Sequence, residues 1–239
     1  MALPQPKQTA TDARLAALDL PEGGWSAPAR QSALARLQAM GLPGARDEYW
    51  KYTRPDTLVA AEAPTAAVFQ GDEPLVFDGV DRLKIVFRDG VFDAEASDPL
   101  ALEHIEIARL ADAADIHWAQ DLYGKLEENG QTPVERPLAA LNTAFATDGI
   151  LMRVTGKVSK PVALIYYHES ETSDAILHHV IKVDAGAEVT ILENGPAAAR
   201  FNEVIDLEAI LDVIFTAMRP ELDFRIEAEN MELGRPTVA

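Results

Sequence analysis

The residues with the clearest capacity for metal chemistry are two adjacent histidines, His178 and His179. Imidazole nitrogens bind zinc and related ions, and a site needs three or four ligands around one ion. Adjacent residues on a strand point to opposite faces, so these two histidines cannot chelate one ion from a regular strand. A third ligand, such as His168 or Glu193, would have to come from a neighbouring strand. Because HxH and HExxH spacings are absent, we expect no metal site and predict that both histidines are hydrogen-bonded sheet residues.

The segment most similar to a phosphate-binding loop is Gly156-Lys157. A P-loop would need glycine at position 151 and serine or threonine at position 158, where this chain has Leu151 and Val158. We therefore predict a turn between strands. The chain has no cysteine and no GxSxG motif, so it offers neither a thiolate nor the nucleophilic serine of an esterase elbow. We expect no catalytic residue and no cofactor, and we identify no cofactor-binding residue.

The strongly acidic composition of the chain disfavours two classes of partner. The 239 residues carry a formal net charge of −18, which disfavours binding to nucleic acid or to an anionic membrane surface. We interpret Glu127-Glu128 and Glu169–Asp174 as solvated loop charge. Met1–Thr11 has one lysine and no apolar core, and no apolar run approaches the roughly 20 residues that span a bilayer. We expect a soluble, cytoplasmic protein.

The first half of the chain predicts a helical layer with a small β element. Helices are expected over Thr11–Leu20, Ala29–Met40 and Asp115–Leu126, the last because Trp118, Leu122 and Leu126 recur at helical spacing. The run Leu83–Phe92 predicts a hairpin around Asp89-Gly90, and Ile105–Leu110 is ambiguous. Within the aromatic and charged segment Arg46–Arg54, we expect Trp50 and Tyr52 to anchor a loop to the helices rather than to form a ligand cage.

The histidines belong to a strand-rich stretch that follows a short helix. Arg136-Pro137 opens this helix, with Leu138, Leu141 and Phe145 on one face, and Asp148-Gly149 ends it. Strands are predicted at Ile150–Val154, Val162–Tyr167, Ile176–Val183 and Val189–Leu192. Both faces of Val162–Tyr167 are largely apolar, which predicts cover on both sides. Short strands without helices between them favour a β-coil or an antiparallel sheet over βαβ units.

Three stretches, taken in order and with their spacing, resemble SufD-type proteins of iron–sulfur cluster assembly. They are RDEYWKYT at Arg46–Thr53, VFRDGVF at Val86–Phe92, and RPLAALNTAFATDGILMRVTGKVSKPVALIYYHE at Arg136–Glu169, which continues through HHVIKVDAGAEVTILE to Glu193. The resemblance extends from about Leu42 to about Val204.

The resemblance implies an α+β fold. We expect a mostly helical domain at 1–149, the first coils of a right-handed parallel β-helix at 150–204, and a C-terminal amphipathic helix within 205–239. Family members work with the paralogue SufB and the ATPase SufC on a scaffold where clusters are assembled. A non-catalytic scaffold subunit with SufB-like and SufC-like partners is therefore implied. By the same resemblance, the later coils that pair with SufB and the helices that engage SufC are missing.

The last segment has a different pattern. An apolar stripe of Leu207, Ile210, Leu211, Ile214, Phe215 and Met218 predicts a helix that caps the sheet or supports self-association. After it, ELDFRIEAEN at Glu221–Asn230 resembles a stretch of UbiB/AarF-like atypical kinases, which would match Glu221 and Asp223 to an acidic pair and Glu227 to the glutamate that pairs with the nucleotide-site lysine. The alternative function is thus a nucleotide-binding fragment, inactive because that lysine strand and the metal-binding loops are missing. A third hypothesis is a fused chain without either activity.

Overall fold

The computed structural model describes residues 3–50, 52, 55–62, 77–113, 117–172 and 174–195. The chain divides into two units, Met1–Asn194 and Gly195–Ala239, and all of the described helices and strands belong to the first. The predicted tail helix, its apolar stripe and the residues Glu221, Asp223 and Glu227 lie outside the described residues. Among the helices that are described, none has the length and apolarity needed to cross a bilayer.

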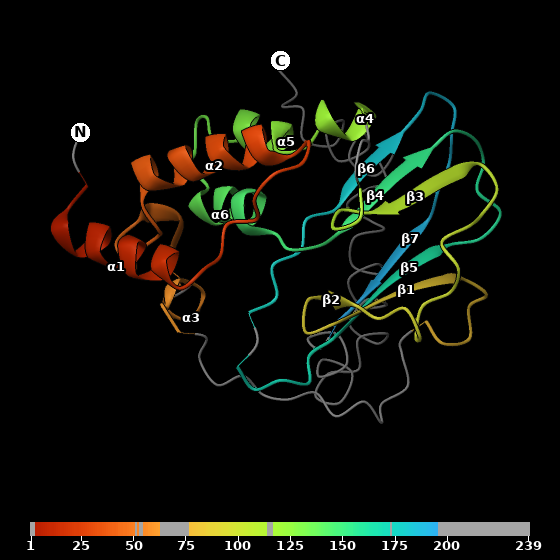
Figure 1. The fold of residues 1–239 in the computed structure, drawn as a ribbon, viewed down its shortest axis with the longest axis horizontal. Coiled ribbons are helices and arrows are strands. Elements are labelled where there is room, and N and C mark those ends of the chain that lie inside the picture. The colour runs from red at the N-terminus through yellow and green to blue at the C-terminus, as the bar shows by residue number, and fades with distance from the viewer. Residues whose placement is uncertain are drawn as a thin grey trace, which may run out of the picture. The chain divides into compact units, whose positions relative to one another are not determined.

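The first unit is a mixed α/β structure with several helices and two sheets (Figure 1). Its helices are α1 (Gln5–Ala16), α2 (Ala27–Met40), α3 (Asp56–Val59), α4 (His117–Gln120), α5 (Lys125–Asn129) and α6 (Pro137–Phe145), with a 3-10 turn η1 (Glu48–Trp50). The α2 and α6 helices pack on each other through a core that includes Leu37, Leu141 and Phe145. This core continues onto Leu151 and Val180 in the second sheet, so the helices and that sheet share apolar packing.

Helix boundaries follow the predicted start and stop residues in α2 and α6. Pro28 lies in the first turn of α2, and Gly41 ends that helix with φ 66°. Proline opens α6, and its predicted apolar face is confirmed because Leu141 and Phe145 are buried. The first helix starts earlier than predicted, at Gln5 after Pro4, and ends at Ala16.

The single helix predicted over Asp115–Leu126 is wrong. The chain forms two short helices, α4 and α5, separated by a turn that ends at Gly124 in the left-handed conformation (φ 75°). Leu122 and Leu126 are 37% and 87% exposed, whereas Tyr123 is buried. The helical spacing of the leucines was misleading because the turn at Gly124 directs the adjacent aromatic ring into the core instead.

The aromatic segment near residue 50 also differs from expectation. Tyr49 is 72% exposed and Tyr52 is 91% exposed, so Tyr52 does not anchor the loop by burial. Trp50 is partly buried at the end of η1, and its anchoring role stays a prediction. Tyr49 and Trp50 line two cavities, and Val134, Glu135 and Pro137 line both as well.

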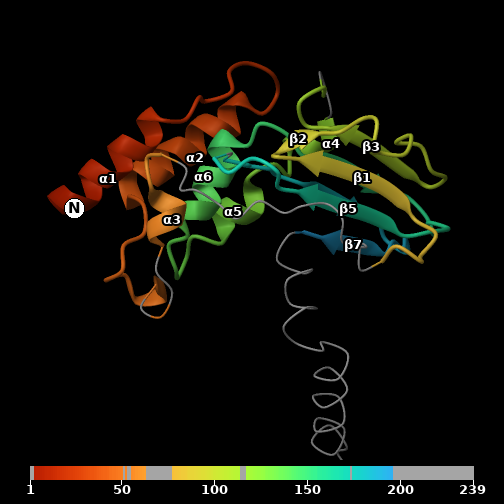
Figure 2. The same cartoon turned by 90° about the horizontal axis from the view of Figure 1, so that it is seen from below.

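The strands form two sheets (Figures 1 and 2). The first has the order β2-β1-β5-β7 and the second the order β3-β4-β6. Their bounds are β1 (Leu83–Arg88), β2 (Val91–Phe92), β3 (Ile105–Arg109), β4 (Ile150–Val154), β5 (Val162–Tyr167), β6 (Val180–Val183) and β7 (Ile191–Asn194). The hairpin predicted around Asp89-Gly90 is confirmed, since β1 and β2 pair antiparallel. The ambiguous segment at Ile105 is a strand.

From β4 onward the chain alternates between the two sheets. Strand β5 follows β4 but joins the other sheet, β6 returns to pair with β4, and β7 pairs with β5. Both pairings are parallel, and their partners lie 29 positions apart in each case: Leu151 with Val180, and Val162 with Ile191. Parallel neighbours without an intervening helix distinguish this winding from βαβ units and from an antiparallel meander.

Alternate side chains of the strands pack into a core between the two sheets. Ile150, Met152 and Val154 of β4 face it, while Leu151 faces the helical core. The prediction that Val162–Tyr167 is covered on both faces is confirmed: Leu164 packs between the sheets and Ile165 packs in a smaller cluster on the other side.

Two predicted strands have different bounds. The run Ile176–Val183 forms a strand only from Val180, after an isolated bridge between Leu177 and Asp148, and the last described strand begins at Ile191 rather than Val189. Each sheet combines strands from before and after residue 149, the predicted end of the helical domain. In the first sheet β1 pairs with β5, and in the second β3 pairs with β4.

Candidate functional site

The candidate site is a junction around His178 and His179, where the helices meet both sheets. His178 lies against the Tyr123 ring of the helical layer, with centroids 4.5 Å apart. His179 lies against Phe87 of β1 and Tyr166 of β5, with centroid distances of 5.7 and 6.1 Å. The two rings therefore point to opposite sides of the chain, as expected from alternation in an extended segment. Both residues lie just before β6, however, so the prediction that they are strand residues is wrong.

His179 is held by two hydrogen bonds whose directions can be assigned. The backbone N–H of Ile150 donates to Nδ1 over 2.9 Å, so Nδ1 carries no proton. Neutral imidazole then carries its proton on Nε2, which donates to the Tyr166 hydroxyl 3.0 Å away. That hydroxyl donates in turn to Oε1 of Glu193 over 3.1 Å. We call His179, Tyr166 and Glu193 the relay.

The relay uses the groups that a metal would need. A metal-binding histidine normally donates its other ring N–H to an acceptor, whereas Nδ1 of His179 accepts a bond. Glu193, a predicted third ligand, contacts His179 only through Tyr166, and His168 lies 3.5 Å from Asp89 instead. Within the described part of the chain, no three histidine, aspartate or glutamate residues are grouped as metal ligands.

Burial controls the protonation of this junction. It lowers the pKa of His179, although Glu193 and Asp148 oppose the shift. It lowers the pKa of His178 to about 4, aided by His179 and Arg30. Burial likewise raises the pKa of Tyr166, and the adjacent Glu193 carboxylate adds to the shift. Both histidines are therefore neutral near pH 7, as the assigned tautomer of His179 requires.

On the helical side, Arg30 ties α2 to the end of α6. Its Nη1 donates to the carbonyl oxygens of Ala144 and Ala146 over 3.0 and 2.7 Å, and its guanidinium lies 5.4 Å from the Tyr123 ring centre. The Tyr123 hydroxyl donates to the Thr143 carbonyl over 2.7 Å. These bonds satisfy carbonyls that a helix C-terminus leaves unpaired. Nδ1 of His178 is buried there without a hydrogen-bond partner among the described residues.

On the sheet side, Asp148 lies just before β4 and forms hydrogen bonds to three segments of the chain. Its carboxylate accepts from Nη2 of Arg109 over 2.7 Å and from the backbone N–H of Gly149 over 2.8 Å. Its carbonyl accepts from the N–H of His178 over 3.0 Å. A side chain at Gly149 would overlap the His178 carbonyl, so glycine permits this close approach of the two segments.

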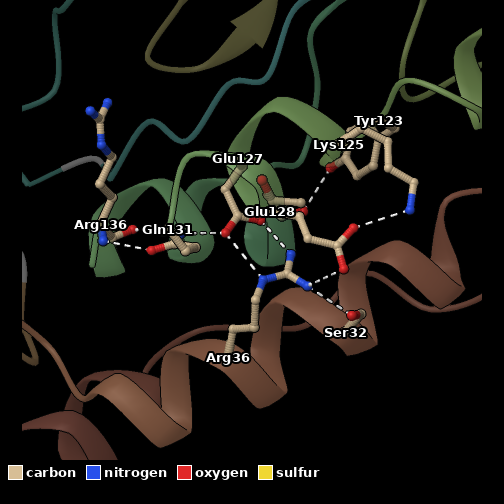
Figure 3. Close-up of polar contacts among 9 residues, drawn as sticks. Ser32, Arg36, Tyr123, Lys125, Glu127, Glu128, Gln131 and Arg136 are labelled. Atoms are coloured by element: carbon tan, nitrogen blue, oxygen red, sulfur yellow. Dashed lines mark hydrogen bonds and ion pairs between the residues drawn. The ribbon is translucent and has the colours of Figure 1, made fainter. Parts of the chain in front are cut away.

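A second polar cluster, which the sequence did not reveal, joins α2 to α5 (Figure 3). Arg36 forms a two-point ion pair with Glu127, with Nη2–Oε2 and Nε–Oε1 distances of 2.5 and 3.2 Å. The Glu127 side chain is only 6% exposed, so its interpretation as solvated loop charge is wrong. Gln131 also donates to Glu127, over 2.5 Å. Glu128 is more exposed and pairs with Lys125 at 3.1 Å, which lowers its pKa.

The remaining predicted positions stay apart from the junction. Lys157 pairs with Glu188 on the surface at 2.9 Å, and Gly156 lies in a bend, consistent with the predicted turn. Glu169 bonds to Arg88, and Asp174 pairs with Arg14 at 2.5 Å.

No protein-family model matches this sequence, and no curated protein matches it either.

Proposed function

We propose that this chain is a SufD-like component of a SufBCD-type iron–sulfur cluster assembly scaffold and catalyses no reaction by itself. The supporting observation is the winding of the strands. Successive strands from β4 to β7 alternate between two sheets, and the parallel partners keep a constant offset of 29 residues, Leu151 to Val180 and Val162 to Ile191. Such a path is what the first coils of the expected right-handed parallel β-helix would follow. The Arg136–Glu193 stretch that resembles the family contains these strands.

Strand β6 supports the idea that a further layer follows. Its Ile181 and Val183 pair with Met152 and Val154 of β4, which are fully buried between the sheets. Ile181 and Val183 are 39% and 47% exposed. In a stacked structure these side chains would be buried by a next coil, since each layer covers the one before it. The exposed side chains of β6 would then be a site of association with a SufB-like partner, which would supply the covering layer.

The test is association with purified SufB-like and SufC-like proteins. The full chain should elute together with them in size-exclusion chromatography. An Ile181→Asp/Val183→Asp variant should weaken this association at least tenfold, because it places charge on the exposed end of the inter-sheet core. Val91→Asp is the control: Val91 is 65% exposed on β2, an edge strand of the other sheet, and the change should have no effect. Separate elution of the unmodified chain would contradict the proposal.

The alternative, a nucleotide-binding fragment related to UbiB-like kinases, depends on Glu221, Asp223 and Glu227, which lie outside the described residues. Binding of ATP with magnesium by the full chain, lost in Asp223→Asn, would favour it over the scaffold. No turnover above background is expected, because neither a P-loop nor a complete kinase site is present in the sequence.

A further inference from the structure

The relay connects both sheets and ends on β7. Ile150, which donates to His179, begins β4 in the second sheet, whereas Tyr166 and Glu193 belong to β5 and β7 of the first. Strand β7 has four residues and pairs with β5 from Val162 to Ile165. The bond between Tyr166 and Glu193 therefore adds a side-chain attachment to a short backbone ladder.

This attachment depends on a neutral imidazole. A proton on Nδ1 of His179 would face the N–H of Ile150, so two donors would meet and the bond between them would be lost. The displaced imidazolium would also be attracted to the Glu193 carboxylate, in competition with the Tyr166 hydroxyl. The first effect releases the ring from β4, and the second lets the ring replace the Tyr166 hydroxyl on Glu193, which breaks the side-chain bond between β5 and β7.

We propose that His179, Tyr166 and Glu193 form an acid-sensitive latch on β7, closed when His179 is neutral and opened when it is protonated. The latch is a property of the isolated chain and does not depend on the scaffold function. It would control how firmly β7, the last described strand, is held in the first sheet. Any further strand of that sheet would pair with β7.

The charged groups around His179 set the range in which the latch opens. Glu193 on β7 and Asp148 before β4 favour the protonated ring, and Asp148 is partly neutralised by Arg109 of β3. The apolar Phe87 of β1 lies against the ring, while the adjacent His178 points to the helical side of the chain. Burial outweighs the two carboxylates and lowers the pKa of His179 from its ordinary value, so the latch opens only in acidic solution.

Native-state amide hydrogen exchange of the full chain tests the latch. After correction for intrinsic exchange rates, the protection of the Ile191–Asn194 amides should fall about tenfold between about pH 7.5 and the acidic pH at which NMR shows the His179 ring to be protonated. This is the amount expected for loss of one charge-assisted bond. Amides of β1, an inner strand of the same sheet, should fall much less. An equal fall in β1 and β7 would indicate general loosening and overturn the proposal.

Two variants separate the latch from other acid effects. His179→Phe should remove the pH dependence of β7 protection, and Tyr166→Phe should lower that protection at both pH values. A tenfold fall that persists in His179→Phe would overturn the proposal. If either variant does not fold, NMR titration of the unmodified chain decides: the Glu193 and Asn194 amides should shift with the same midpoint as the His179 ring, and a different midpoint would also overturn the latch.

Discussion

At the scale of single residues, breaking the ion pair between Arg36 and Glu127 should destabilise the fold because it leaves the Glu127 carboxylate buried without a cation. The Glu127 side chain is 6% exposed, so in Arg36→Leu its carboxylate would be neither paired with Arg36 nor hydrated. We expect the free energy of unfolding to fall by about 3 kcal/mol in Arg36→Leu, measured by urea denaturation. The double variant Arg36→Leu/Glu127→Leu should recover at least half of that loss, because no charge then remains buried.

An exposed pair provides the control for this prediction. Lys157 and Glu188 lie 2.9 Å apart, but their side chains are 78% and 66% exposed. Lys157→Leu should therefore change the free energy of unfolding by less than about 1 kcal/mol. Similar losses in Lys157→Leu and Arg36→Leu would show that burial is not the reason for the importance of Arg36.

His178 should make the protein sensitive to acid. Its pKa is about 4 when folded and 6.5 when unfolded, so below pH 6.5 the unfolded chain binds a proton that the folded chain does not. Stability is therefore present above pH 6.5 and is lost progressively as the pH falls toward 4, by roughly 3 kcal/mol at most. His178→Phe keeps an aromatic ring against Tyr123 and should reduce the loss measured between about pH 7 and about pH 4.5 by about 2 kcal/mol.

The control for His178 is an exposed histidine. The His104 side chain is 50% exposed, and its backbone has φ 66°, which asparagine tolerates better than most residues. His104→Asn should keep the wild-type dependence of stability on pH. If His178→Phe keeps it as well, burial of His178 does not contribute to acid sensitivity.

At the scale of elements, the break between α4 and α5 is fixed by Gly124. This residue has φ 75°, and a Cβ there would lie 2.9 Å from Cγ2 of Thr143 in α6. Gly124→Ala should lower the free energy of unfolding by about 2–4 kcal/mol, since backbone strain and overlap with α6 add. A thermal melt of the variant beside the unmodified chain measures this loss.

Two other glycines separate strain from overlap. Gly23 has the same φ of 75° with nothing near its would-be Cβ, so Gly23→Ala should cost only about 1 kcal/mol. Gly44 has neither strain nor close neighbours, and Gly44→Ala should be neutral or slightly stabilising. Equal melting temperatures for all three variants would show that the turn at Gly124 is not required.

At the scale of the whole molecule, a scaffold role must be separated from cluster binding. The chain has no cysteine and so supplies no thiolate, the usual ligand of iron–sulfur clusters. We expect the isolated chain to retain no cluster after anaerobic reconstitution and desalting. The measurement is the visible absorption of the desalted protein together with its iron content. Near-stoichiometric iron with cluster absorption would contradict this expectation and would indicate ligands other than cysteine.

The sequence determined the local elements wherever one local rule was sufficient. The apolar runs Ile150–Val154 and Val162–Tyr167 located β4 and β5 with their observed bounds, and Asp89-Gly90 located the hairpin. Proline at the start of α6 and glycine after α2 marked helix ends because both residues restrict or release the backbone independently of their surroundings. The opposite orientation of His178 and His179 followed from the same kind of rule.

Only the tertiary structure decided which side chains meet. Arg36 and Glu127 are 91 positions apart, and Tyr166 reaches both His179 and Glu193 from another strand. Spacing along the chain contains no signal for such pairs, since they depend on how helices and sheets pack. The same packing selected Tyr123 over Leu122 and Leu126 for the core. It also made the β4–β6 and β5–β7 pairings parallel, because strand direction depends on where the chain returns to a sheet.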